Sequence, residues 1–196
     1  MSLACVSPIR QTENRFWGLD PQPVLSLELT VAAKKVLTDQ NMDPSFKRFV
    51  EMLHPSFECL MQMVPLKMSA LPSRLPEKCI YLLSEGQNHF YVGRTRKLRK
   101  RLRQHSIASA QHNQAVFAFK LSRETTGQLA AAYSAEGSRK ALCVEPVFAD
   151  AFKQAKARVR NMDLRFVEEA DPTRQALLEI YASVVLRTKY NDFDTH

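Results

Sequence analysis

The spacing of hydrophobic residues changes partway along the chain and divides it into two parts. In the first part apolar residues recur every three or four positions, which predicts helices at residues 21–40 and 43–64. Asp43 followed by Pro44 is a typical start for the second of them, and Pro55 is expected to kink or split it. Residues 65–78 contain three prolines and predict a linker into the next unit.

Beyond the linker the pattern is typical of short strands. Residues 79–83 and 90–93 flank a polar turn and predict a hairpin, and residues 115–121 predict a third strand. Residues 163–169 are a candidate for a further short strand. The chain closes with a strongly marked helix at residues 171–188, where an aspartate precedes a proline.

Between the third strand and the last helix, residues 123–162 are rich in helix signals and are interpreted as an insertion. Its main pieces are predicted helices at 125–142 and 147–162. The sequence therefore predicts an α+β unit at residues 75–196, preceded by an N-terminal arm and helical extension at residues 1–74.

Positive charge is concentrated in one short segment. Lys and Arg outnumber Asp and Glu by 28 to 20, a formal net charge of +8. Residues 94–105 contain seven basic side chains and no acidic one, so this segment alone can account for most of the excess. Such a segment suits the phosphates of a nucleic acid, although a basic helix is also a common solvated surface.

Other classes of protein are disfavoured by the composition. The four cysteines are scattered singly, which indicates neither a zinc site nor a disulfide framework. No apolar run is long enough to span a membrane, and the first ten residues lack a secretory signal, so a cytoplasmic protein is expected.

Two tyrosines of the predicted hairpin are expected to face the same spot. If residues 81 and 91 pair across the hairpin, Tyr81 and Tyr91 point to the same side. Gly93 ends the strand and would let a backbone or ligand approach closely. Aromatic residues are favoured in strands in any case, so packing alone would also explain both tyrosines.

The helix after this hairpin breaks a local rule. Thr95 is its candidate N-cap, which would place Arg96 and Lys97 in the first turn, where the helix dipole disfavours cations. Arg101 and His105, four residues apart, would lie beside the leucines that anchor the helix. A local rule broken without compensation often marks a functional site. The remaining basic side chains are expected to point to solvent, as Lys97, Arg99, Lys100 and Arg103.

Glu179 in the last helix has no cation at helical pairing distance and lies at the edge of an apolar stripe. A carboxylate partly removed from water needs a partner. Arg101 would make Glu179 merely structural, whereas a divalent cation would make it functional, since Mg²⁺ near phosphate often uses one or two carboxylates. The sequence leaves both alternatives open.

Together these pieces resemble the GIY-YIG nuclease family. "CIY" at residues 79–81 and "YVG" at residues 91–93 correspond to its two motifs, with cysteine in place of the usual first glycine. The resemblance covers residues 78–121 and 171–193 and implies a small three-stranded antiparallel sheet flanked by helices. Four more residues match the helix arginine, a frequent histidine, the metal-binding glutamate and a late asparagine of the family: Arg101, His105, Glu179 and Asn191.

The resemblance implies a catalytic site made of Tyr81, Tyr91, Arg101, His105, Glu179 and Asn191. Glu179 would hold one Mg²⁺ or Mn²⁺, Arg101 would supply a fixed cation, and Tyr81, supported by Tyr91, would act as general base. The DNA-contacting residues would be Gly93, Arg94, Arg96, Lys97, Arg99, Lys100 and Arg103.

The leading hypothesis is a metal-dependent DNA endonuclease, restriction-type rather than a repair subunit, acting on duplex DNA as a possible homodimer. The alternative is a nucleic-acid-binding module that keeps this fold without cutting. A third interpretation makes Arg101 and Glu179 an ordinary ion pair in a protein-interaction domain. The first two differ in whether the carboxylate chemistry is needed, and the third predicts both tyrosines in a core.

Overall fold

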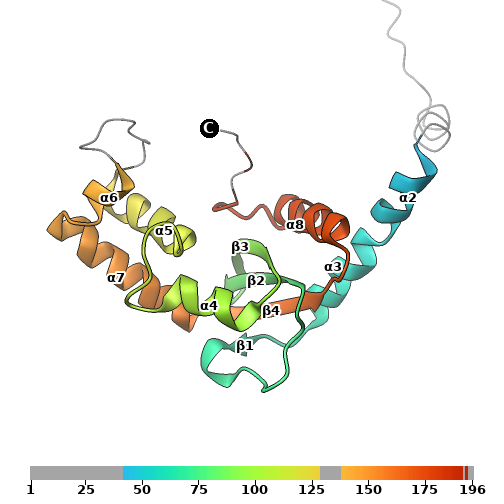
Figure 1. The fold of residues 1–196 in the computed structure, drawn as a ribbon, viewed down its shortest axis with the longest axis horizontal. Coiled ribbons are helices and arrows are strands. Elements are labelled where there is room, and N and C mark those ends of the chain that lie inside the picture. The colour runs from blue at the N-terminus through green and yellow to red at the C-terminus, as the bar shows by residue number, and fades with distance from the viewer. Residues whose placement is uncertain (1–41, 129–137, 192, 194–196) are drawn as a thin grey trace, which may run out of the picture. The chain divides into compact units, whose positions relative to one another are not determined.

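The computed structural model describes residues 42–128, 138–191 and 193 (Figure 1). The helix predicted at residues 21–40 lies outside this part of the chain. An antiparallel four-stranded sheet forms the centre, with strand order β1-β4-β2-β3. The strands are β1 (Leu66–Lys67), β2 (Cys79–Glu85), β3 (Asn88–Thr95) and β4 (Asp163–Glu168).

Two of the helix starts read from the sequence are confirmed. The carboxylates of Asp43 and Asp171 accept hydrogen bonds from the first backbone N–H groups of α2 and α8. The helix predicted at 43–64 is split into two, as expected from Pro55, with the division at Met52. The helices are α2 (Pro44–Glu51), α3 (Leu53–Gln62), the short 3₁₀ turn η1 (Met68–Ala70), α4 (Leu98–Ser106), α5 (Val116–Thr126), α6 (Arg139–Leu142), α7 (Pro146–Asn161) and α8 (Pro172–Leu186).

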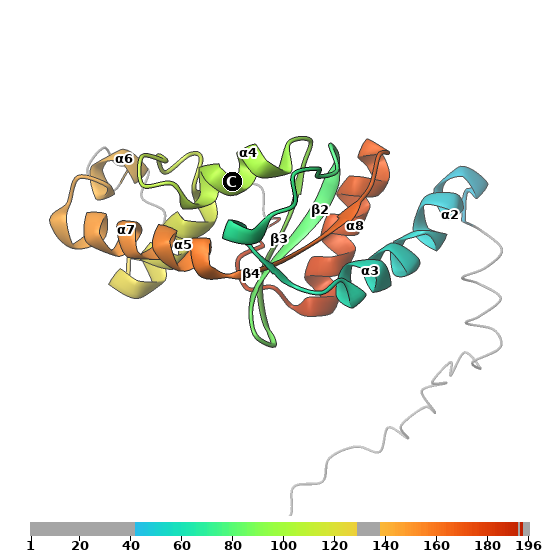
Figure 2. The ribbon, with the colours of Figure 1, turned by 90° about the horizontal axis from the view of Figure 1, so that it is seen from below.

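Helices cover both faces of the sheet. Figure 2 shows α3 and α8 on one side of it and α4, α5 and α7 on the other. β2 is the strand buried on both faces, because Tyr81 and its neighbours on one face join the α4–α5–α7 core, whereas Ile80 and Leu82 join the α3–α8 core. Burial on both faces explains why this strand is an uninterrupted apolar run in the sequence.

The third predicted strand is a helix. Residues 115–121 were expected to be extended, but they lie at the start of α5, where Phe117, Ala118 and Phe119 are all buried. A short apolar run that is buried on every side has neither strand nor helix periodicity, so the pattern could not separate the two. Its place in the sheet is taken by β4, the candidate strand at 163–169, and β1 adds a fourth strand from within the predicted linker.

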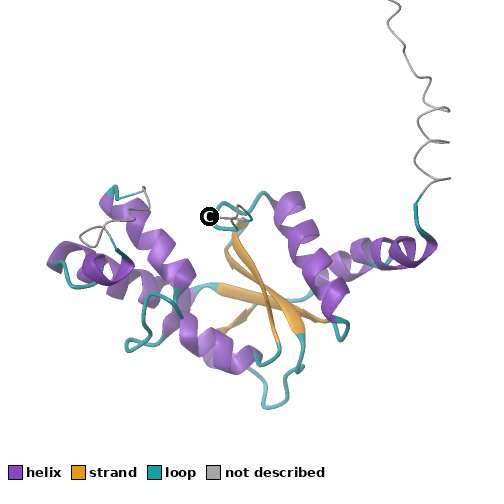
Figure 3. Ribbon diagram, turned by 45° about the horizontal axis from the view of Figure 1, so that its top comes forward, coloured by secondary structure: helices purple, strands orange, loops and turns teal. Residues whose placement is uncertain are grey.

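The predicted insertion forms a layer of helices beside the sheet. α5 ends at Gly127, whose φ of +71° is the left-handed conformation that favours glycine at a helix end. Of the helix predicted at 125–142, the described residues contain only its first two positions in α5 and the short α6; residues 129–137 are not described. The helix predicted at 147–162 is confirmed as α7, and Figure 3 shows these helices grouped to one side of the strands.

Candidate active site

The hairpin brings its two tyrosines onto one face through a register different from the expected one. Tyr81 pairs with Gly93, and Leu83 pairs with Tyr91, with an irregularity after Leu83. The shift relative to the expected pairing is two residues, and because side chains alternate, both tyrosines still lie on the same face. Their ring centroids are 6.2 Å apart.

Gly93 is required by the tyrosine opposite it. A Cβ atom at this position would lie 2.5 Å from Cζ of Tyr81, closer than any real contact. The space that the sequence assigned to an approaching backbone or ligand is therefore filled from within the protein. The hydroxyl end of the tyrosine lies against the glycine, the side chain is fully buried, and its hydroxyl is hydrogen-bonded to a side chain of α4.

His105 on α4 is the hydrogen-bond partner of that hydroxyl. Tyr81 Oη and His105 Nε2 are 2.7 Å apart, and neither side chain is accessible to solvent. Burial, reinforced by the positive charge of Arg101, lowers the pKa of His105 to about 3, so the imidazole is neutral near pH 7. Its other nitrogen, Nδ1, is buried without a hydrogen-bond partner among the described residues.

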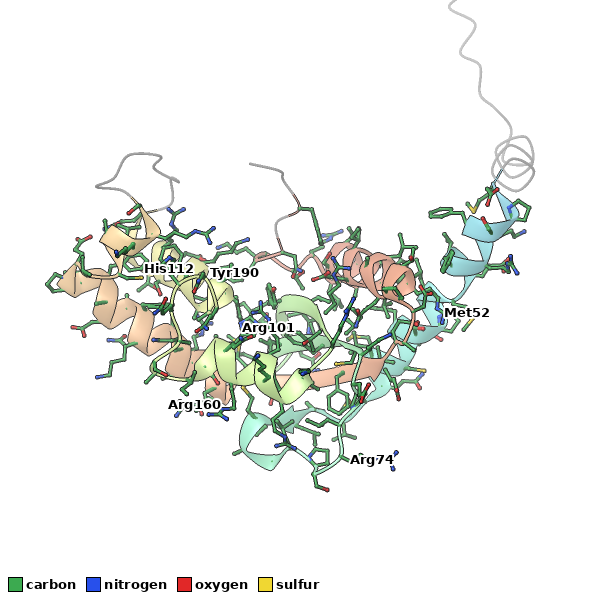
Figure 4. The ribbon with its side chains drawn as sticks, viewed as in Figure 1. Met52, Arg74, Arg101, His112, Arg160 and Tyr190 are labelled. Carbon is green, nitrogen blue, oxygen red and sulfur yellow. The ribbon has the colours of Figure 1, made fainter. Side chains whose placement is uncertain are left out.

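Arg101 places a cation beside both phenols. Burial alone would lower the pKa of Arg101, but its hydrogen bonds and charge interactions with Tyr81 and Tyr91 raise that pKa above its usual value. The guanidinium, labelled in Figure 4, also donates to the carbonyl of Gln114 at 3.1 Å, which fixes its orientation. Burial raises the pKa of both tyrosines and outweighs the opposing effect of Arg101, so both phenols are protonated at rest.

Glu179 is paired, but with neither partner that the sequence suggested. Arg94 Nε lies 3.0 Å from Glu179 Oε2, with the carboxylate side chain 18% exposed and that of the arginine 50% exposed. Partial burial raises the pKa of Glu179, and the charges of Arg94 and Arg101 counter part of that rise. Arg101 therefore acts on Glu179 through space, while the direct contact comes from the residue immediately after Gly93.

Asn191 holds the outer strand of the hairpin rather than pointing into the site. Its side-chain amide accepts from the N–H of Val92 and donates to the carbonyl of Val92, both at 2.8 Å. β3 is an edge strand, and an edge N–H and C=O need such partners. Thr188 donates to the same amide oxygen at 2.9 Å, which fixes the side chain. Asn191 thereby positions the strand that carries Tyr91.

One residue that joins the parts of the site was missed in the sequence. Gln175, one helical turn before Glu179 on α8, is buried and donates from Nε2 to the carbonyl of Cys79 at 3.0 Å and of Thr95 at 3.1 Å. It ties α8 to both strands of the hairpin. The available signal was an amide facing the same side as Leu178, within an otherwise apolar stripe.

The basic residues lie around the start of α4, with one correction. The helix begins at Leu98, so Arg96 precedes it and Lys97 is the N-cap. Thr95 is not the N-cap, although its hydroxyl accepts from the N–H of Lys97 at 3.1 Å. Leu98 and Leu102 anchor the helix in the core, and the following residues are all exposed: Arg94, Arg96, Lys97, Arg99, Lys100 and Arg103.

A divalent metal fits the donor set at this site. No group of three or more His, Cys, Asp or Glu side chains is placed to hold a metal within the described ranges. Mg²⁺ bound next to phosphate needs only one or two protein carboxylates, because water and substrate oxygens complete its shell. Glu179 supplies one carboxylate that is still reached by solvent and lies close enough to Arg101 and both tyrosines to affect their charge.

This combination of paired phenols, a fixed guanidinium and one carboxylate is suited to stabilising a phosphodiester during its cleavage, which is the chemistry of a nuclease. The family comparison agrees: the GIY-YIG catalytic domain matches residues 77–191, more than half of the chain. The chain therefore belongs to the GIY-YIG family, whose catalytic domain is a phosphodiester-cleaving nuclease domain. Searches of curated proteins and of solved structures found no match.

Tyr81 lies in the core and Tyr91 packs against it, which is the arrangement expected for an unrelated protein-interaction domain. The confirmed family membership nevertheless excludes that interpretation. Among the helices in the described ranges, none is long and apolar enough to cross a membrane.

Proposed function

We propose that this protein is an endonuclease that hydrolyses phosphodiester bonds of DNA with the help of one Mg²⁺ or Mn²⁺ ion. The observation that carries the proposal is the hydrogen bond between Tyr81 and His105, buried beside the Arg101 guanidinium. This buried polar triad of Tyr81, His105 and Arg101 is not needed to hold α4 against the sheet. Leucine side chains would pack there at a lower cost in free energy.

Glu179 is the residue that would hold the metal. The ion, when bound, would polarise the phosphate and offset the charge that develops on the leaving oxygen. Arg94 occupies one oxygen of the carboxylate and, being half-exposed, can move to a phosphate of the substrate. The ion pair thus keeps the carboxylate charged despite the rise in its pKa caused by burial.

Tyr81 is the candidate general base. Burial raises its pKa, so the phenol is protonated at rest and would have to release that proton to water before it could accept one from the attacking water. His105, whose pKa is about 3, pairs with the phenol by a hydrogen bond and stays neutral. Arg101 favours the phenolate character that develops when the proton is released. Tyr91, which stacks on Phe117 with ring centroids 5.0 Å apart, is held in place to hydrogen-bond the water or the phosphate.

The exposed cations around the start of α4 would bind the DNA backbone. Contacts with several phosphates predict an affinity that falls steeply with salt. One such site cuts one strand, so a restriction-type double-strand break requires two copies of the protein or two successive binding events. The net charge of +8 is consistent with a polyanionic substrate.

Cleavage of supercoiled plasmid at low salt tests the proposal. We expect nicking or linearisation with Mg²⁺ or Mn²⁺, none with EDTA, and none by Glu179→Gln, which keeps the shape of the side chain but removes its charge. Glu58→Gln, an exposed carboxylate on α3, is the matched control and should cut as the wild type does. Plasmid that is bound but never cut, across varied DNA substrates, would instead identify a binding module without catalysis.

A further inference from the structure

A cavity lies on the other side of α4 from the candidate active site. Consecutive residues of an α-helix are rotated by about 100°, so residues two positions apart face nearly opposite ways. Arg99 and Arg103 therefore project away from the side that carries Arg101 toward the tyrosines. They line a cavity of about 420 Å³ together with Arg160 from the end of α7.

The cavity combines an apolar wall with three guanidinium groups. Its apolar lining comes from η1 and the residues beside it, and from the end of α4, as Met68, Leu71 and Ile107. No acidic residue lines it, and no carboxylate of the described residues pairs with Arg99, Arg103 or Arg160. The volume lies within the range of about 300–1,000 Å³ that is usual for sites of small organic ligands.

Two of the three arginines are held by the backbone. Arg99 donates to the carbonyl of Pro72 at 2.6 Å, and Arg160 donates to the carbonyl of Ser106 at 2.9 Å (Figure 4 labels Arg160 beside α4). These bonds orient the guanidinium groups without neutralising them. The wall therefore presents fixed positive charge, and its natural ligand carries negative charge next to a flat or apolar group.

An unpaired nucleotide has that chemistry. We propose that this cavity binds one nucleotide of the substrate strand, turned out of the base stack, with its base against the apolar wall and a flanking phosphate on the arginines. A paired duplex presents only phosphates and sugars to such a surface, whereas an extruded base can bury its face against aliphatic side chains and stack on a guanidinium.

The inference rests on the proposed nuclease function and specifies its substrate. A DNA strand that leaves the catalytic site would cross the exposed face of α4 to reach the cavity. Lys100 lies on this face, between the side of the helix that carries Arg101 and the side that carries Arg103. Turning a base out of a paired duplex costs a few kcal/mol, and least where the base is already unpaired. DNA with a bulge or single-stranded segment beside the cleavage position is then preferred over perfect duplex.

Fluorescence anisotropy in EDTA at low salt measures this preference without cleavage. The probes are a labelled perfect duplex and the same duplex with one extra unpaired nucleotide. We expect the bulged duplex to bind about five- to tenfold more tightly, the low end of what one stacked base supports. Leu71→Trp, which fills the cavity, and Arg103→Ala, which removes one exposed cation from it, should each abolish most of that ratio.

Two controls separate the possible outcomes. Lys100→Ala should weaken both probes by the same factor and keep their ratio, because it removes a backbone contact outside the cavity. Lys153→Ala removes an exposed cation from α7, outside the cavity lining, and should keep the ratio. Equal affinity for the two probes, or a ratio that survives both cavity variants, overturns the inference. The absence of plasmid cleavage would instead contradict the proposed function itself.

Discussion

Arg94 and Glu179 form an ion pair across the edge of the hairpin, with Nε and Oε2 3.0 Å apart. The arginine follows the glycine on which Tyr81 packs, and the glutamate lies on the helix that covers the opposite face of the sheet. The pair therefore links the two layers at the candidate metal ligand. It also means that a cation already occupies part of the position that a divalent metal would take.

Removing Arg94 should strengthen metal binding at Glu179. An ion pair this exposed contributes about 1 kcal/mol or less, so Arg94→Ala should tighten Mn²⁺ binding by at most about fivefold. Electron paramagnetic resonance of free Mn²⁺, without DNA, measures this directly. Lys153→Ala removes the same charge from α7 and controls for the change in net charge. Equal Mn²⁺ affinity in wild type and Arg94→Ala would show that the pair does not compete with the metal.

Gly93→Ala should reduce both stability and activity. The added methyl group would overlap the Tyr81 ring, which has no room to move in a fully buried site, and overpacking of this kind costs about 1–3 kcal/mol of unfolding free energy. Urea unfolding and plasmid nicking measure the two effects. Gly86→Ala is the matched control, since its φ of +58° makes alanine strained while the space around it is open. Nicking should survive in Gly86→Ala, and its loss there would show that strain in the turn alone inactivates the enzyme.

His105 should make the protein less stable in acid. Its pKa is lowered to about 3 in the folded protein from an ordinary value of 6.5, so between these values the unfolded chain binds more protons. The free energy of unfolding therefore falls as the pH drops through this window, by up to about 5 kcal/mol in total. His105→Gln, whose amide can still meet Tyr81, should flatten this dependence in urea unfolding at pH 4 to 7.

The loop residue His112 provides the control for that series. His112→Gln makes the same chemical change outside the buried triad and should keep the slope of the wild type. A slope that is equally steep in His105→Gln and wild type would mean that another group causes the loss of stability in acid.

Asn191→Ala should loosen the edge of β3. It removes both hydrogen bonds to Val92 and leaves a strand edge whose N–H and C=O must find water, at a cost of about 1–3 kcal/mol. Amide hydrogen exchange at Val92 should become faster, together with a fall in plasmid nicking because Tyr91 is no longer held. Asn161→Ala, at the exposed end of α7, is the control. Unchanged exchange at Val92 would contradict a positioning role for Asn191.

Much of the site follows from local rules in the sequence. Strand alternation places Tyr81 and Tyr91 on one face whether the register is the expected one or the observed one, since the two differ by an even number of residues. The helical repeat likewise places His105 and Arg101 on neighbouring positions of α4, toward the sheet. The capping aspartates define where two helices start, because their side chains satisfy backbone groups only a few residues away.

Other features depend on segments that are distant in the sequence. The pairing of Arg94 with Glu179, the bonds from Gln175 to the hairpin and the cavity between α4, α7 and η1 each join elements more than 20 residues apart. The same is true of α5, whose helical form at residues 116–126 reflects burial against α7 rather than its own pattern.

The sequence by itself therefore determined the hairpin, its paired tyrosines, the basic helix and the family. The tertiary structure decided which cation meets Glu179, why Gly93 cannot carry a side chain, and where Arg103 points. The physical reason is the separation along the sequence over which each effect acts. Alternation, helical period and capping act over a few residues and can be read locally, whereas ion pairs and packing depend on how separate elements meet.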